Sequence, residues 1–119
     1  MLNVVLLNPE IPPNTGNIGR LCVAIGARLH LVKPLGFHID DKSLRRAGLD
    51  YWKKLDLKVW DDFDSYARHV KPQQVVLTSS KRGHIYTELS YHADDHIVFG
   101  PETRGLDVLT LEMFPNRIA

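Results

Sequence analysis

The chain has 119 residues, of which 44% are hydrophobic and 24% charged, and its formal net charge is +1. This length allows one domain with a single buried core, and the composition excludes a disordered protein. The near-neutral charge excludes a protein that binds nucleic acid over its whole surface. Any RNA contact must therefore come from a local basic patch, or from patches joined across an oligomer.

Nothing in the sequence indicates secretion, membrane insertion or a bound metal. The N-terminus, MLNVVLLNPE, lacks the positively charged start of a signal peptide and soon turns polar. No apolar run approaches the roughly 18 residues that a membrane span needs. The single cysteine, Cys22, cannot form an internal disulfide, and the histidines are not spaced as zinc ligands. We therefore expect a cytoplasmic protein without a metal, with Cys22 packed as a small apolar side chain.

Short apolar runs predict the strands of a parallel sheet. They are rich in Val, Ile and Leu and are continuous rather than alternating, as expected where both faces of the sheet are covered. The runs are Val4 to Leu7, Leu29 to Val32, Val75 to Thr78 and His96 to Phe99, with a weaker fifth at Leu57 to Trp60.

Helical patterns lie between these runs and predict an α/β fold, a parallel sheet flanked by helices. The first helix has an expected apolar face of Ile18, Leu21, Cys22 and Ile25. Gly26 can end it. A second helix can begin at a cap on Asp40 or Asp41 and carries Leu44, Arg45 and Arg46. A third, with Phe63, Tyr66, Ala67 and Val70, can begin at Asp61 or Asp62 and end before Pro72.

Ligands of such sheets bind at the carboxyl ends of the strands, so the loops there are the candidate sites. The first loop, residues 8–20, contains three prolines, and Asn14, Gly16 and Asn17 suit a tight turn that runs into a helix start. Amide groups at that start favour an anion, and Arg20, one turn inside, can bind a phosphate or carboxylate. The alternative is a proline-rich turn, an asparagine cap and a surface arginine.

The second loop, Phe99 to Leu106, has two glycines and a proline directly after a buried strand. They allow close approach of the backbone to a ligand, and Glu102 can accept hydrogen bonds there. The alternative is an ordinary turn with a solvated glutamate. A third loop, Thr78 to Gly83, offers hydroxyls and a basic pair, which is a weaker signal.

A basic cluster with interleaved aromatic residues follows the second predicted strand. It consists of Lys42, Arg45, Arg46, Lys53 and Lys54, with Tyr51 and Trp52. Such residues can attract phosphates and stack on unpaired bases. Four nearby aspartates oppose its charge, so a solvated helix face with aromatic core packing is the alternative.

Taken together, the first two loops resemble the SpoU branch of the SPOUT methyltransferases. Residues 14–22 resemble its motif 1, and Phe99 to Leu106 resemble its motif 2. The stretches 35–37, 40–42 and 44–51 are similar to the group called TrmL or YibK, which methylates the ribose of the tRNA wobble nucleotide, cytidine or a modified uridine.

The resemblance implies a homodimeric S-adenosylmethionine enzyme acting on the tRNA anticodon stem-loop, with a C-terminal trefoil knot around the cofactor. The implied cofactor-binding residues are Leu77, Thr78, Ser79, Gly100, Glu102, Gly105 and Leu106. The implied catalytic residues are Asn14, Arg20 and Glu102. The implied RNA-binding residues are Arg20, Lys42, Arg45 and Arg46.

Arg20 keeps its proton at physiological pH, so we expect it to stabilise the developing alkoxide or clamp a phosphate, and not to act as a free base. Relatives of this type continue into a third motif, whereas this chain ends at Ala119. We therefore expect residues 1–119 to be one C-terminally incomplete domain that binds cofactor weakly or not at all and does not turn over by itself. The alternatives are a non-catalytic RNA-binding module or truncated fragment of the same fold, and a generic α/β protein that binds a nucleotide or an anion.

Overall fold

The computed structural model describes residues 1–37, 54–78, 93–106 and 110. The predicted second helix lies outside these residues, as does the basic cluster except Lys54. Ser79 and the implied RNA-binding residues Lys42, Arg45 and Arg46 lie outside them too.

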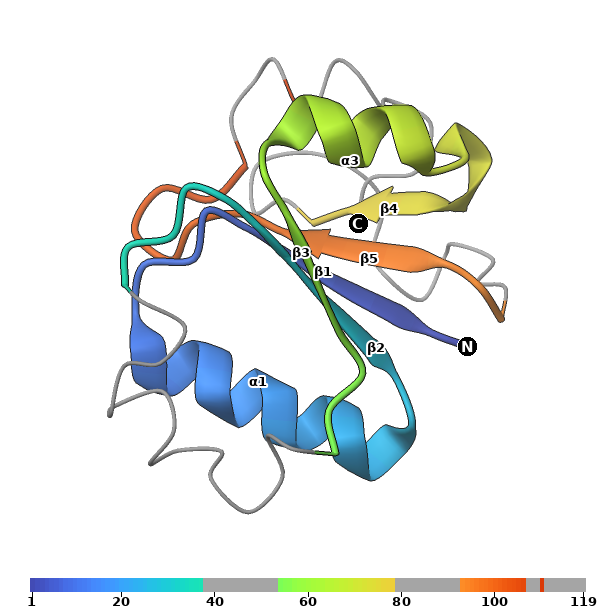
Figure 1. Ribbon diagram of the computed structural model, residues 1–119. Helices are drawn as coiled ribbons and strands as arrows, with labels where there is room; N and C mark the ends of the chain where they lie inside the picture. Colours follow the sequence, from blue (N-terminus) through green and yellow to red (C-terminus); the bar gives the residue numbers. More distant parts are fainter. Residues whose placement is uncertain (38–53, 79–92, 107–109, 111–119) are drawn as a thin grey trace.

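The described residues form a parallel sheet of five strands in the order β3-β2-β1-β5-β4 (Figure 1). The strands are β1 (Asn3–Leu7), β2 (Arg28–Val32), β3 (Leu57–Trp60), β4 (Val75–Leu77) and β5 (His96–Phe99). All the predicted strands are confirmed, with ends that differ by at most one residue. The weaker fifth run is β3, an edge strand whose side chains are only partly buried.

Helix α1 spans Pro12–Ile25, so the predicted turn at residues 14–17 is wrong. Two prolines fit the first turn of a helix, because the N–H groups that they lack would make no hydrogen bond within the helix there. Arg20 consequently lies about two turns inside the helix and not one. Gly26 ends the helix as predicted, in the left-handed conformation with φ 71°.

The predicted apolar face of α1 is only partly correct. Cys22 is buried, but Leu21 and Ile25 are 56% and 54% exposed. The side of α1 that meets the sheet instead carries Thr15, Gly16, Gly19 and Cys22. Small residues at these positions let the helix lie close to the sheet, which turns the larger Leu21 and Ile25 outward.

Helix α3 spans Phe63–His69 and confirms the third predicted helix. The Asp62 carboxylate caps it by accepting a 2.8 Å hydrogen bond from the Ser65 amide. A short 3-10 turn, η1 (Pro72–Gln74), then leads into β4.

The two helices lie on opposite faces of the sheet, α1 below it and α3 above it in Figure 1. Each face has its own hydrophobic cluster. Cys22 of α1 packs with Leu6, Ala27, Leu29 and Leu31, whereas Tyr66 of α3 packs with Val5, Leu7, Val32, Val70, Val75, Leu77 and Val98. No helix in the described ranges is long and apolar enough to cross a membrane.

Candidate active site at the carboxyl edge of the sheet

The loops that follow β1, β2 and β5 gather at one edge of the sheet, at the left of Figure 1. β1 lies between β2 and β5, so the chain leaves it toward one side of the sheet and later returns on the other side. Open α/β sheets bind ligands at the crevice that such a change of direction creates. The topology therefore brings the loops carrying motifs 1 and 2 together, as the sequence predicts.

The Glu102 carboxylate joins the motif 2 loop to the start of α1. Its oxygens accept hydrogen bonds from the amides of Glu10, at 2.7 Å, and Ile11, at 3.3 Å. Ile11 is the N-cap residue, directly before α1, and its side chain provides no cap. Glu102 thus places a negative charge beside the positive end of the helix dipole.

Glu10 makes the reciprocal connection, which the sequence did not predict. One of its carboxylate oxygens accepts hydrogen bonds from the Thr103 amide, at 3.1 Å, and the Thr103 hydroxyl, at 2.8 Å. These bonds lower the pKa of the Glu10 carboxyl, and the nearby positive charge of Arg104 adds to the effect. The available signal was a repeated Pro-Glu pair, Pro9-Glu10 after β1 and Pro101-Glu102 after β5.

The loop after β2 is fastened to the same edge. The Asn8 side chain donates to the carbonyl oxygens of Val32 and Pro34, each at 3.3 Å, and the Gly36 amide donates to the Pro9 carbonyl at 2.8 Å. A Cβ atom at Gly36 would lie 2.9 Å from the Cα of Glu10, so the contact requires glycine.

The motif 2 loop folds back on itself at two glycines. A Cβ atom on Gly100 would lie 2.3 Å from the Gly105 carbonyl carbon, so only glycine fits there. Gly105 has φ +69°, and a Cβ atom built on it would meet no atom of the described residues within 4 Å. The fold thus needs Gly105 for its backbone conformation and not to avoid a clash with another described residue.

Two of the implied cofactor-binding residues lie at the end of β4, next to β5. Leu77 is 1% exposed and packs in the cluster under α3. The Thr78 amide and hydroxyl donate to the Val98 carbonyl of β5 at 3.1 and 3.0 Å. Their main chain is thus fixed beside the strand that leads into the motif 2 loop.

Motif 1 presents a polar row on α1. Asn14, Asn17 and Arg20 are all exposed and follow one another at intervals of three residues, which places neighbours in this row on the same side of a helix. The sequence indicates Asn17 only as a turn residue, because Asn and Gly at residues 14–17 favour a turn where the structure has a helix. Asn14 and Arg20 are separated by about 9 Å along the helix axis.

Thr15, between these polar residues, faces the sheet. It is fully buried, and its hydroxyl has no hydrogen-bond partner in the described part of the structure. Within the same residues, no group of three or more His, Cys, Asp or Glu side chains is placed to hold a metal ion.

Comparison with known proteins supports the family resemblance that motifs 1 and 2 indicate. The sequence profile of the SpoU rRNA Methylase family matches residues 1–119. The chain belongs to this family. A tRNA (cytidine(34)-2'-O)-methyltransferase of Yersinia pestis is 48% identical over 120 residues, a match that covers 97% of this chain and 74% of that protein.

Solved structures of SpoU-type proteins share the fold. A structure described as giving structural insights into the 2-OH methylation of C/U34 on tRNA has a TM-score of 0.93 at 39% identity, covering 99% of this chain and 78% of its own. An AdoMet-bound rRNA methyltransferase from Sinorhizobium meliloti has a TM-score of 0.85 at 21% identity, covering 98% of this chain and 46% of its own. That likeness shows the fold alone. The sheet is therefore that of a SPOUT methyltransferase, as expected.

Proposed function

We propose that this SpoU-family protein transfers a methyl group from S-adenosylmethionine to the ribose 2′-hydroxyl of the tRNA wobble nucleotide. The observation that carries the proposal is the pair of reciprocal carboxylate contacts that hold the motif 1 helix against the motif 2 loop. They join a polar helix face, suited to RNA, to a glycine-lined loop, suited to a cofactor. The relatives named for methylation of cytidine 34 support this substrate.

The motif 2 loop and the end of β4 fit the cofactor. No described residue crowds the main chain at Gly105, and Thr78 fixes the end of β4 against β5. We assign Leu77, Thr78, Ser79, Gly100, Gly105 and Leu106 to the pocket. When bound, S-adenosylmethionine supplies a methyl group on a positively charged sulfur, which needs no metal to activate it. The protein's task is then to hold the 2′-hydroxyl in line with that methyl group.

The polar row of α1 would receive the ribose. The 2′-oxygen gains negative charge as its proton leaves, and the permanent charge of Arg20 stabilises it or an adjacent phosphate that takes the proton. Asn14, one turn from the helix start, can hydrogen-bond the ribose.

Glu102 is better suited to positioning than to proton transfer. Both of its oxygens already accept main-chain hydrogen bonds from the start of α1. A carboxylate used in this way fixes the helix that carries Asn14 and Arg20 relative to the cofactor loop. We therefore assign Glu102 a role that acts through α1.

A homodimer and an anticodon stem-loop contact complete the proposal. Leu21 and Ile25 expose more than half of their side chains on α1, a surface that a second copy can cover. The net charge of one chain is only +1, so two subunits that join their basic patches would attract the stem-loop more strongly than one. The residues assigned to this contact are Arg20, Lys42, Arg45 and Arg46. A protein that modifies tRNA in this way would work in the cytoplasm.

Methyl transfer to defined tRNA tests the function. Unmodified tRNA is incubated with the full-length protein and labelled S-adenosylmethionine, and the methylated nucleotide is located by nuclease digestion and mass spectrometry. We expect one methyl group at nucleotide 34, and none when that nucleotide lacks its 2′-hydroxyl. Methylation elsewhere, or no methylation of any tRNA, would contradict the proposal.

Arg20 variants test the role of the guanidinium. Arg20→Lys keeps the charge but loses the planar donor pair, and we expect kcat to fall at least tenfold, with a smaller change in KM for tRNA. Arg68→Lys, the same change at an exposed arginine of α3, is the control and should leave turnover unchanged. Near-normal turnover by Arg20→Lys would refute the role.

A further inference from the structure

A cavity of about 430 Å³ lies at the opposite edge of the sheet from motifs 1 and 2. The first residues of three neighbouring strands, Arg28, Asn3 and His96, are aligned in the sheet and form part of its lining. His69 at the end of α3 and Lys71 before η1 line it as well. The cavity is thus on the α3 face of the sheet. The side chains at the amino ends of the strands are polar there, whereas those farther along the strands are apolar.

The lining is positively charged. It contains Arg28, Lys58 and Lys71, and no carboxylate is among the described residues that line it. Asp56 offsets one of these charges through a 3.0 Å ion pair with Arg28. Lys58 and Lys71, both exposed, leave an excess of positive charge over the cavity.

Hydrogen bonds hold the wall of the cavity rigid. The Trp60 indole N–H donates to Nδ1 of His30 at 3.0 Å, so Nε2 of His30 carries the proton and donates to the Asn3 side chain at 2.8 Å. The Tyr66 hydroxyl is 2.9 Å from Nδ1 of His96. These side chains are therefore arranged before any ligand arrives.

The two inner histidines are neutral at physiological pH. The pKa of His30 is lowered to about 4, mainly by burial, with smaller contributions from electrostatic repulsion by His96 and Arg28. Burial also lowers the pKa of His96, although Asp95 partly opposes this. The fixed charge that faces a ligand therefore comes from Lys58, Lys71 and Arg28.

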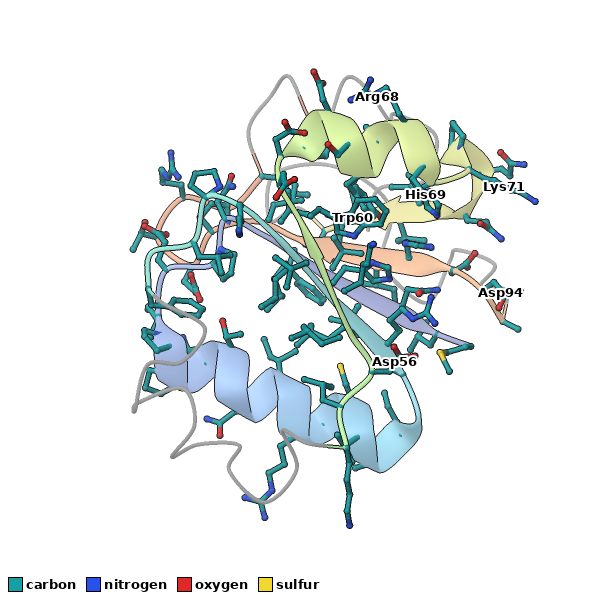
Figure 2. The ribbon with its side chains drawn as sticks, in the orientation of Figure 1. Asp56, Trp60, Arg68, His69, Lys71 and Asp94 are labelled. Carbon is teal, nitrogen blue, oxygen red and sulfur yellow. The ribbon has the colours of Figure 1, made fainter. Side chains whose placement is uncertain are left out.

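Lys58 is already held over the cavity wall. Its ammonium nitrogen lies 4.9 Å from the centre of the Trp60 ring, a cation–π distance. Figure 2 shows Trp60 and His69 between α3 and the sheet and Lys71 beyond the end of α3, while Arg68 lies on the outer side of that helix. The charges that line the cavity are thus distinct from those of the outer surface of α3.

We propose that this amino-edge cavity binds a phosphate group, supplied either by the backbone of a bound RNA or by a free phosphate compound. A compact group of high negative charge with several acceptor oxygens suits two ammonium groups and a guanidinium at a preformed polar wall. This site is separate from the proposed methyl-transfer site, so it does not depend on that reaction.

The test compares a double variant of the cavity with a matched control. Lys58→Gln/Lys71→Gln removes two charges from the lining, whereas Arg68→Gln removes one from the neighbouring surface. Inorganic phosphate, 5′-AMP and uncharged adenosine are titrated into each protein. Binding is followed by the NMR signals of the His30 and His96 rings and the Trp60 indole N–H. We expect phosphate and 5′-AMP, but not adenosine, to shift these signals in the unchanged protein and in Arg68→Gln, and to bind about tenfold more weakly to the double variant.

An RNA arm identifies the source of the phosphate. The affinity for an anticodon stem-loop RNA is measured over a range of salt concentrations. If the backbone supplies the phosphate, the double variant should reduce the slope of log affinity against log salt by about 2 and Arg68→Gln should not. If only phosphate and 5′-AMP binding weaken, the ligand is a free phosphate compound. Two results together would overturn the proposal. The cavity signals would not shift with phosphate or 5′-AMP, and the double variant would weaken RNA binding no more than Arg68→Gln does.

Failure of this proposal is distinguishable from failure of the proposed methyl transfer. Arg20→Ala should abolish turnover and leave the phosphate-dependent shifts of the cavity signals unchanged. Those shifts require no cofactor and no reaction.

Discussion

Glu10 and Glu102 hold each other's loops in place. The Glu102 carboxylate accepts hydrogen bonds from the amides of Glu10 and Ile11. The Glu10 carboxylate accepts hydrogen bonds from the amide and hydroxyl of Thr103. The two residues are 92 positions apart in the chain, yet they occupy matching places after adjacent strands. Their contacts convert two separate sequence motifs into one edge of the sheet.

Removing the Glu102 carboxylate should loosen the start of α1. In Glu102→Ala the amides of Glu10 and Ile11 lose their acceptors, so we expect their hydrogen exchange to speed up by about tenfold or more. The turnover number for methyl transfer should fall more than the KM for tRNA changes, because α1 carries Asn14 and Arg20. Glu102→Gln, which keeps one acceptor oxygen, should recover part of both effects.

Glu10→Ala distinguishes the two halves of this contact. It should speed exchange at the Thr103 amide, while the Ile11 amide changes less. Asp61→Asn, a change at an exposed carboxylate beside α3, is the control and should alter neither amide. Equal exchange in all these variants would show that the two carboxylates do not hold the loops.

Thr15→Val should leave the fold as stable as before or more stable, by up to about 1 kcal/mol. Valine has nearly the shape of threonine, and the buried hydroxyl it removes has no partner in the described part of the structure. Thr15→Ser keeps the hydroxyl and loses a methyl group, so it should be less stable than the valine variant. Urea unfolding of both variants measures the difference, and a valine variant less stable than the serine variant would show that the hydroxyl is bonded.

Cys22 should resist thiol reagents while the protein is folded. The side chain is fully buried, and burial raises the pKa of the thiol to about 11, so little reactive thiolate forms at pH 8. Labelling by a chromogenic disulfide reagent should be slow in buffer and immediate in guanidinium chloride. Comparable rates in the two solutions would place Cys22 at the surface.

Acid should destabilise the protein between pH 6.5 and 4 through His30. Its pKa is about 4 in the folded state and about 6.5 when unfolded, so over this range the unfolded chain binds the extra proton. The stability is therefore fully present above the unfolded value and is lost as the pH falls. A protonated ring would also lose the acceptor that Trp60 uses.

Urea unfolding at pH 7.5 and 4.5 measures this loss, which should be about 2 kcal/mol for His30. His96 adds to it, since its pKa is lowered in the same direction. His30→Gln should be less stable at pH 7.5 but should show a smaller loss on acidification. An unchanged pH dependence in that variant would exclude His30 as the source.

Local signals were sufficient for most of the secondary structure in the described ranges of the chain. The apolar runs located β1 to β5, and the Asp62 cap and Gly26 stop located one end each of α3 and α1. The error at α1 has a clear cause. Asn14 and Gly16 usually favour turns, but here packing against the sheet requires small residues within a helix, and tertiary contact outweighs local preference.

The sequence by itself determined the strands, the parallel sheet and the family, because these depend on local apolar patterns and on motifs readable within a few residues. Only the tertiary structure decided that Glu10 faces Thr103, that Leu21 points outward, and that charged residues from β2, β3 and the α3–η1 segment line one cavity. These relationships join residues distant in the chain. The order and register of the strands set them, and no local pattern encodes which strands become neighbours.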